Sequence, residues 1–165
     1  MANEVEVLVG RFHRANLAAI ATITGCTEEQ LLLACPVERC TVAALACHVA
    51  DRNAVGAEWV RMILAGEPLP PLTRDLVEQV DALGFTRNAY RPKRDVLERL
   101  RRSGAEAAAV LGQLHDADWD RRSPFTLFGG PTVSIRELVT AMLIEEPESH
   151  LRSIRAAIAA GTAIT

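Results

Sequence analysis

The chain has 165 residues, of which 49% are hydrophobic and 24% charged, with a net charge of −3. This composition is typical of one folded globular domain and excludes an intrinsically disordered chain. Basic residues are interleaved with acidic ones, so we expect no nucleic-acid partner. No apolar run approaches the roughly 20 residues of a membrane span, and no signal-peptide pattern is present, so we expect a cytoplasmic protein with no membrane partner.

A cytoplasmic location predicts reduced thiols rather than disulfides for the four cysteines, Cys26, Cys35, Cys40 and Cys47. None of them forms a C-x-x-C pair, which gives little support to a cysteine zinc site. Cys47 directly precedes His48, and a reactive thiol is conceivable there. An inert, packed side chain is the favoured interpretation, because free cysteines usually behave as small hydrophobic residues.

Apolar residues at steps of three and four predict a first helix from Asn3 to Ile23. Capping-box spacing predicts a short helical turn over Glu28 to Leu33. A second long helix is predicted from Thr41, a suitable N-cap, to Leu64, and Gly66 ends it.

The stretch from Glu67 to Arg91 contains three prolines and no sustained period, so we expect a long connection with at most one helical turn, around Asp75 to Leu83. Connections of this length are often functional lids or crossovers. A third helix is predicted from Pro92 to Leu114, and a fourth from Ser134 to Ala160, closed by Gly161. No segment shows strand periodicity. We therefore expect an all-α four-helix bundle forming a single domain over residues 1–165.

The fourth predicted helix carries polar residues beside its apolar face. Glu146 and His150 are four residues apart and so lie one above the other. His48 follows Leu45 by one turn on the second helix, at the edge of its apolar stripe. Imidazole and carboxylate ligands suit a divalent ion such as Zn²⁺, Ni²⁺, Fe²⁺ or Mn²⁺.

Pro147 lies between the two residues of this pair and predicts a kink, since it cannot donate a hydrogen bond to the carbonyl of Leu143. The same residues also allow a purely structural interpretation without a metal. Glu146 and His150 can form an ion pair at the rim of the bundle, and His48 can be a core histidine bonded to a backbone carbonyl. The spacing alone favours this second interpretation.

The segment Thr41-Val-Ala-Ala-Leu-Ala-Cys-His48-Val-Ala-Asp resembles the second-helix signature of the DinB-like superfamily, which includes the N-terminal domain of mycothiol-dependent maleylpyruvate isomerases. Val133-Ser-Ile-Arg-Glu-Leu-Val and Glu146-Pro-Glu-Ser-His150-Leu-Arg-Ser-Ile resemble the fourth helix of that family. The similarity spans about residues 5 to 160. Glu146 stands where the family more often has histidine, and Cys40 where it often has tryptophan.

This resemblance implies a four-helix bundle, often a homodimer, with a divalent metal held by His48, Glu146 and His150. It implies a thiol-dependent transferase or isomerase, in which the metal binds a low-molecular-weight thiol as thiolate, which then attacks a small electrophilic molecule. Arg52, one turn beyond His48, is expected to neutralise an anionic substrate or the carboxylate of the thiol. An ion pair between Arg52 and Glu145 or Glu146 is an equally good expectation.

Two other functions remain open. A metal-dependent hydrolase would activate water at the same site, with Glu145 as the base. A non-catalytic helical module would bind a small ligand or dimerise without a metal.

Overall fold

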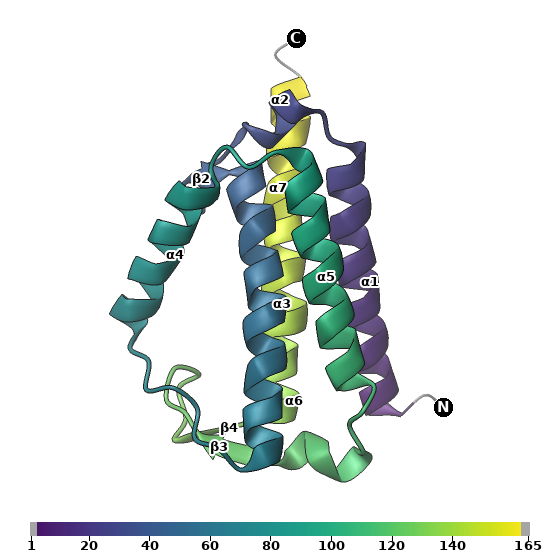
Figure 1. The fold of residues 1–165 in the computed structure, drawn as a ribbon, viewed down its shortest axis with the longest axis vertical. Helices are drawn as coiled ribbons and strands as arrows, with labels where there is room; N and C mark the ends of the chain where they lie inside the picture. The colour runs from purple at the N-terminus through teal and green to yellow at the C-terminus, as the bar shows by residue number, and fades with distance from the viewer. Residues whose placement is uncertain (1–2, 163–165) are drawn as a thin grey trace.

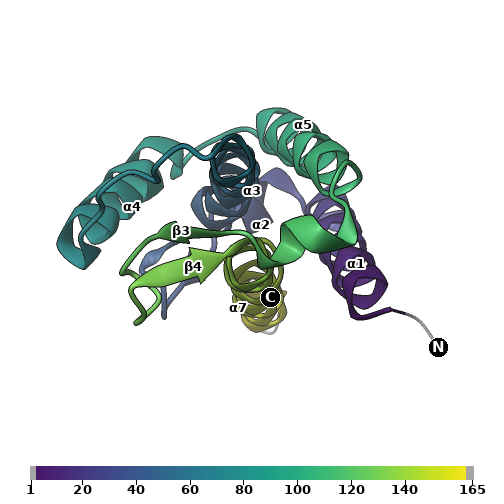
Figure 2. The ribbon, with the colours of Figure 1, turned by 90° about the horizontal axis from the view of Figure 1, so that it is seen from below.

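The computed structural model describes residues 3–162; residues 1–2 and 163–165 of the predicted domain lie outside the described part. Four long helices stand side by side (Figure 1) and confirm the predicted bundle. They are α1 (Glu4–Gly25), α3 (Val42–Ala65), α5 (Lys93–Leu111) and one continuous helix made of α6 (Ile135–Leu138), η2 (Val139–Glu145) and α7 (Glu146–Thr162). Seen from below, the four helices lie around a common axis (Figure 2).

The predicted helix ends agree with the structure to within a few residues, because the capping side chains act as expected. Thr41 accepts a hydrogen bond from the Ala44 amide, and Ser134 forms a capping box with Glu137. Gly66 ends α3 with a φ of 73°, a left-handed conformation that glycine adopts without strain. Gly161 was expected to close the last helix but lies inside α7, where a side chain would collide with Leu33.

The long connection after α3 is more ordered than predicted. It contains a complete helix, α4 (Arg74–Asn88), capped by Thr73, in place of a single turn. Only Asn88 of this helix is buried, which explains why its apolar pattern was too weak to recognise. In Figure 1, α4 stands apart from the bundle beside α3 and returns the chain to the end at which α3 began. Consequently α3 and α5 run in the same direction, and the bundle departs from simple up-and-down order.

Short elements close the two ends of the bundle. At one end lie α2 (Glu28–Leu31) and a hairpin of β1 (Ala34–Cys35) and β2 (Cys40–Thr41); at the other lie the 3₁₀ helix η1 (Asp116–Asp120) and a hairpin of β3 (Arg122–Pro124) and β4 (Thr132–Ser134). These short strands were not predicted, because strands of two or three residues are too short to show a two-residue period, and they leave the all-α fold class unchanged.

The last long helix is not regular throughout. Its middle part, η2, is a π-helix, and the Glu146 amide donates to the carbonyl of Ala141, five residues earlier. Pro147 is thereby the second residue of the α-helix that follows, where its missing amide leaves no bond broken. The chain therefore accommodates the proline with a widened turn directly before the two candidate ligands.

Buried apolar side chains form two clusters along the bundle. On α3, one cluster ends at Ala50 and the other begins at Ala57. His48 and Arg52 lie close to the junction between them, on helix turns that face α4 and α7. None of the helices in the described part is long and apolar enough to cross a membrane.

Candidate metal centre

The structure brings the three predicted ligands together from α3 and α7. One donor atom from each of His48, Glu146 and His150 lies within 4.8 Å of the other two. Oε1 of Glu146 is 3.3 Å from Nε2 of His48 and 3.5 Å from Nε2 of His150. The two imidazole centroids are 5.1 Å apart. The cluster joins residues of two helices that are about 100 positions apart in the sequence. An i,i+4 ion pair between Glu146 and His150 on one helix does not require His48 beside it.

Each imidazole also has a carboxylate behind it. Oε1 of Glu38 is 3.4 Å from Nδ1 of His150 and accepts a hydrogen bond of 2.7 Å from the hydroxyl of Ser153. Oδ1 of Asp81 is 3.7 Å from Nδ1 of His48. A carboxylate near Nδ1 favours the tautomer that leaves Nε2 free to bind an ion, a pattern shared by many metal-binding histidines.

Sequence reasoning missed both of these carboxylates. Glu38 lies in the turn of the β1–β2 hairpin, and Asp81 lies on α4, so no helix period connects either residue to His48 or His150. Asp81 did carry a signal, because it follows Val77 by four residues and shares its face. An acidic residue on the apolar face of an amphipathic helix indicates a buried partner.

Arg52 completes the cluster. Its Nε donates to Oε1 of Glu146 at 3.0 Å, and a terminal nitrogen donates to Oδ2 of Asp81 at 2.9 Å. Of the two interpretations of Arg52 from sequence, the structure has the ion pair with Glu146, and it adds Asp81 as a second partner. Arg52 thereby ties α3 to both α4 and α7.

The environment keeps Glu146 ionised. Burial by itself raises the pKa of this carboxyl group. The neighbouring imidazoles of His150 and His48, together with the charge on Arg52, outweigh burial and hold the pKa well below its usual range. The side chain is therefore a carboxylate at neutral pH, which is the form that binds a cation.

Two observations show that the residues present fit a divalent ion. Nε2 of His150 is buried and makes no hydrogen bond to any described residue. With neutral imidazoles, the carboxylates of Glu38, Asp81 and Glu146 contribute three negative charges around the cluster and Arg52, which contacts only Asp81 and Glu146, contributes one positive charge, an excess of two negative charges. A divalent cation would bind this nitrogen of His150, which has only the Glu146 carboxylate at 3.5 Å beside it, and would balance the charge.

Glu145, the base proposed from sequence for a hydrolase, lies elsewhere. It is exposed and lines a separate surface hollow together with Arg122 and Arg136. Its charge acts on Arg11 of α1. Neighbouring residues on a helix point about 100° apart, so Glu145 and Glu146 face different sides. The structure does not bring Glu145 to the cluster.

A cavity of about 360 Å³ adjoins the cluster. It is lined by residues of α3, α4, the β3–β4 hairpin, η2 and the start of α7. Glu146, Asp81 and Arg52 line its polar end. The rest of the wall is apolar: Val55, Trp59, Pro70, Leu72, Leu76, Val77, Val80, Phe125, Leu127, Phe128 and Met142.

Fold and site together define a helical-bundle protein with a His/His/Glu cluster able to hold a metal ion. Residues 11–154 match the DinB superfamily, and the chain belongs to that family, as the sequence resemblance predicted. Searches of the curated proteins and of the solved structures find no match.

Proposed function

We propose that this protein is a metal-dependent enzyme that joins a low-molecular-weight thiol to a small electrophilic molecule. The observation that carries the proposal is the position of the cluster. Three converging donors, with Glu38 and Asp81 behind the imidazoles, stand at the polar end of an otherwise apolar cavity. A reactive centre with an adjoining concave apolar pocket is typical of an enzyme site.

His48, Glu146 and His150 would hold a divalent ion such as Zn²⁺, Ni²⁺, Fe²⁺ or Mn²⁺. The bound ion would lower the pKa of a coordinated thiol, so that the thiol is present as thiolate. Glu38 and Asp81 fix the imidazoles, and Arg52 fixes Glu146. In an addition to an activated double bond, the sulfur bonds to one carbon and the neighbouring carbon takes up a proton equivalent to the one the thiol lost.

Metal content tests the proposal directly. We expect His150→Ala to lose at least nine-tenths of the metal that the wild-type protein carries, as measured by elemental analysis, with the helical circular dichroism spectrum unchanged. His13→Ala, at an exposed position on α1, is the matched control and should keep its metal. Equal metal content in the two variants would exclude this ligand set.

A cobalt-substituted protein separates the possible reactions. Addition of a thiol should shift the visible absorption of cobalt if the thiol binds the ion. A spectrum that does not respond to thiol would instead support the hydrolase. The part of that alternative that used Glu145 as a base lacks support, because this side chain is exposed on another face.

A further inference from the structure

The cavity beside the cluster has features that restrict what can occupy it. Its volume of about 360 Å³ is within the range that holds a drug-sized molecule. Its polar groups all lie at one end, and one of them, Glu146, belongs to the metal cluster. A ligand that fills the cavity must therefore have one end beside the cluster and an apolar body along the wall.

Aromatic side chains form one part of that wall. The rings of Trp59 and Phe125 are 5.1 Å apart at an interplanar angle of 66°, and those of Phe125 and Phe128 are 5.5 Å apart at 79°. Edge-to-face stacks of this kind leave ring faces and edges available to a further ring. Leu76 and Phe128 line the cavity and are each 42% exposed, so a ligand in the cavity would remove apolar surface from water.

The charges at the polar end select against an anion. The Arg52 guanidinium already bonds to Glu146 and Asp81, so it has two carboxylates to neutralise before it can attract a ligand. An anionic ligand would have to displace these carboxylates or lie beside them in a poorly hydrated site. An uncharged ligand leaves both ion pairs intact.

We infer that the electrophilic substrate is an uncharged, aromatic small molecule whose ring lies against Trp59 and Phe125 and whose reactive end lies beside Glu146. That this molecule is a substrate rests on the proposed function. Its binding in the cavity depends on neither the metal nor the thiol. This assignment replaces the sequence-based expectation that Arg52 binds an anionic group of the substrate.

A pair of unreactive probes tests the inference on metal-free protein without thiol. 1,3-Dinitrobenzene is an uncharged aromatic quencher of tryptophan, and 3,5-dinitrobenzoate is the same ring with one carboxylate. We expect 1,3-dinitrobenzene to quench Trp59 emission saturably and 3,5-dinitrobenzoate to bind at least tenfold more weakly. Trp59→Phe keeps only the buried Trp119 and should lose the saturable quenching.

Two substitutions on α4 show where the probe binds. Val77→Phe adds volume inside the cavity and should weaken binding of 1,3-dinitrobenzene at least fivefold. Leu83→Phe makes a similar change at an exposed position of the same helix that does not line the cavity, and should leave binding unchanged. Equal binding of the two probes, equal binding to both α4 variants, or no saturable quenching would each overturn the inference. Loss of metal binding with intact probe binding would instead count against the proposed function alone.

Discussion

Glu38 and Asp81 are not among the proposed metal ligands, yet their carboxylates lie beside the imidazoles of His150 and His48. Removal of such an outer partner commonly lowers metal affinity by about 10–100-fold. We expect Glu38→Gln and Asp81→Asn each to weaken zinc binding within this range. The effect of Glu38→Gln should be the larger, because Glu38 lies closer to its imidazole and is the less exposed of the two.

Competition with a coloured chelator measures these affinities. Glu78→Gln, an exposed position on α4, is the control for the loss of one negative charge. An affinity unchanged from wild type in the Glu38 and Asp81 variants would mean that the imidazoles are held by packing alone.

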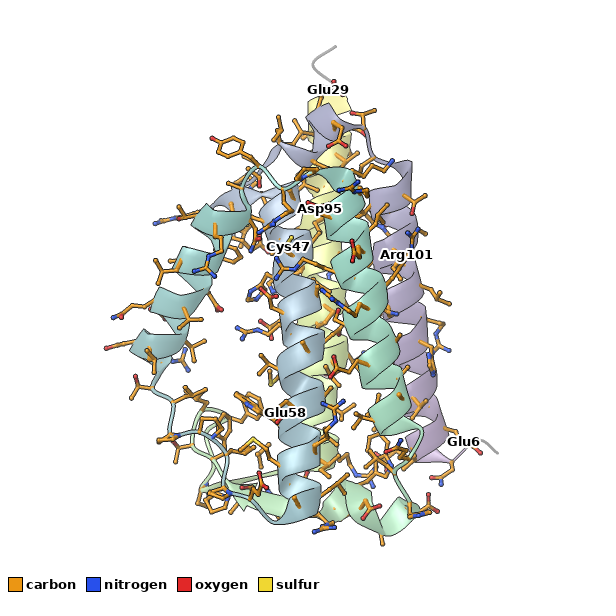
Figure 3. All side chains as sticks on the ribbon, in the orientation of Figure 1. Glu6, Glu29, Cys47, Glu58, Asp95 and Arg101 are labelled. Atoms are coloured by element: carbon orange, nitrogen blue, oxygen red, sulfur yellow. The ribbon has the colours of Figure 1, made fainter. Side chains whose placement is uncertain are left out.

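The buried thiols give the protein a pH-dependent stability. Cys47, labelled on α3 in Figure 3, is fully buried, as is Cys35. Burial raises the pKa of each of these thiols to about 11. In the unfolded chain a thiol ionises near pH 8.5, so between about pH 8.5 and 11 the unfolded state releases protons that the folded state keeps. The free energy of unfolding should therefore be greatest below this window and fall as the pH rises through it.

Urea denaturation at pH 7 to 10.5 measures this dependence, and Cys47→Ala should show a shallower fall than wild type. Identical slopes in the two proteins would assign the loss of stability to other groups. The raised pKa also means that Cys47 is a poor nucleophile at neutral pH, in agreement with the packed role favoured from its sequence.

At the scale of whole elements, the sequence predicted the helices that have a clear apolar period and recognisable end signals. Three of the long helices begin at capping side chains, Asn3, Thr41 and Ser134, and α5 begins directly after Pro92; all four have apolar stripes and were found. Helix α4 was underestimated because it presents only a narrow apolar face, whose meaning depends on the cavity it covers. The π-helix η2 could not be inferred, because a constant 100° per residue was assumed for the whole segment.

The close packing of α3 against η2 depends on Gly56. A methyl group there would lie 2.6 Å from Cδ2 of Leu143, a fully buried side chain that has little room to move. We expect Gly56→Ala to destabilise the protein by about 1–3 kcal/mol, as overpacked cores commonly do. Gly84→Ala, with open space around it on α4, should instead stabilise by about 0.5–1 kcal/mol. Thermal and urea unfolding test both, and a Gly56→Ala variant as stable as wild type would contradict the packing.

On the scale of the whole molecule, the candidate site joins segments that the chain order keeps apart. A motif on two helices was enough to predict His48, Glu146 and His150 as a group, whereas Glu38, Asp81 and the cavity wall come from the hairpins and α4. These residues come together only through tertiary packing, so no regular spacing in the sequence connects them. The single domain and the homodimer expected from sequence remain predictions; light scattering tests the latter, with an expected mass of twice 17.9 kDa.

An ion held between α3 and α7 should stabilise the entire bundle, because it binds only the folded chain. At a free zinc concentration of about 100 times the dissociation constant, this linkage contributes about 2.7 kcal/mol. We expect zinc to raise the melting temperature of the wild-type protein and to leave that of His150→Ala unchanged, as measured by calorimetry. A wild-type protein indifferent to zinc would show that no ion joins the two helices.

The widened turn of η2 has a consequence for how this segment can vary in length. A π-turn accommodates one extra residue in an α-helix while the two flanking halves keep their relative rotation. Deleting Thr140 or Ala141 would therefore let the segment become a regular α-helix without turning Glu146 and His150 away from His48. A segment of the present length that became regular would instead rotate its two halves by about 100° relative to each other, and Leu138 could then keep its place in the core only if both ligands left the cluster. A homologue with one residue fewer here should keep both the architecture and the ion, so an alignment needs a gap at η2 before these side chains are compared.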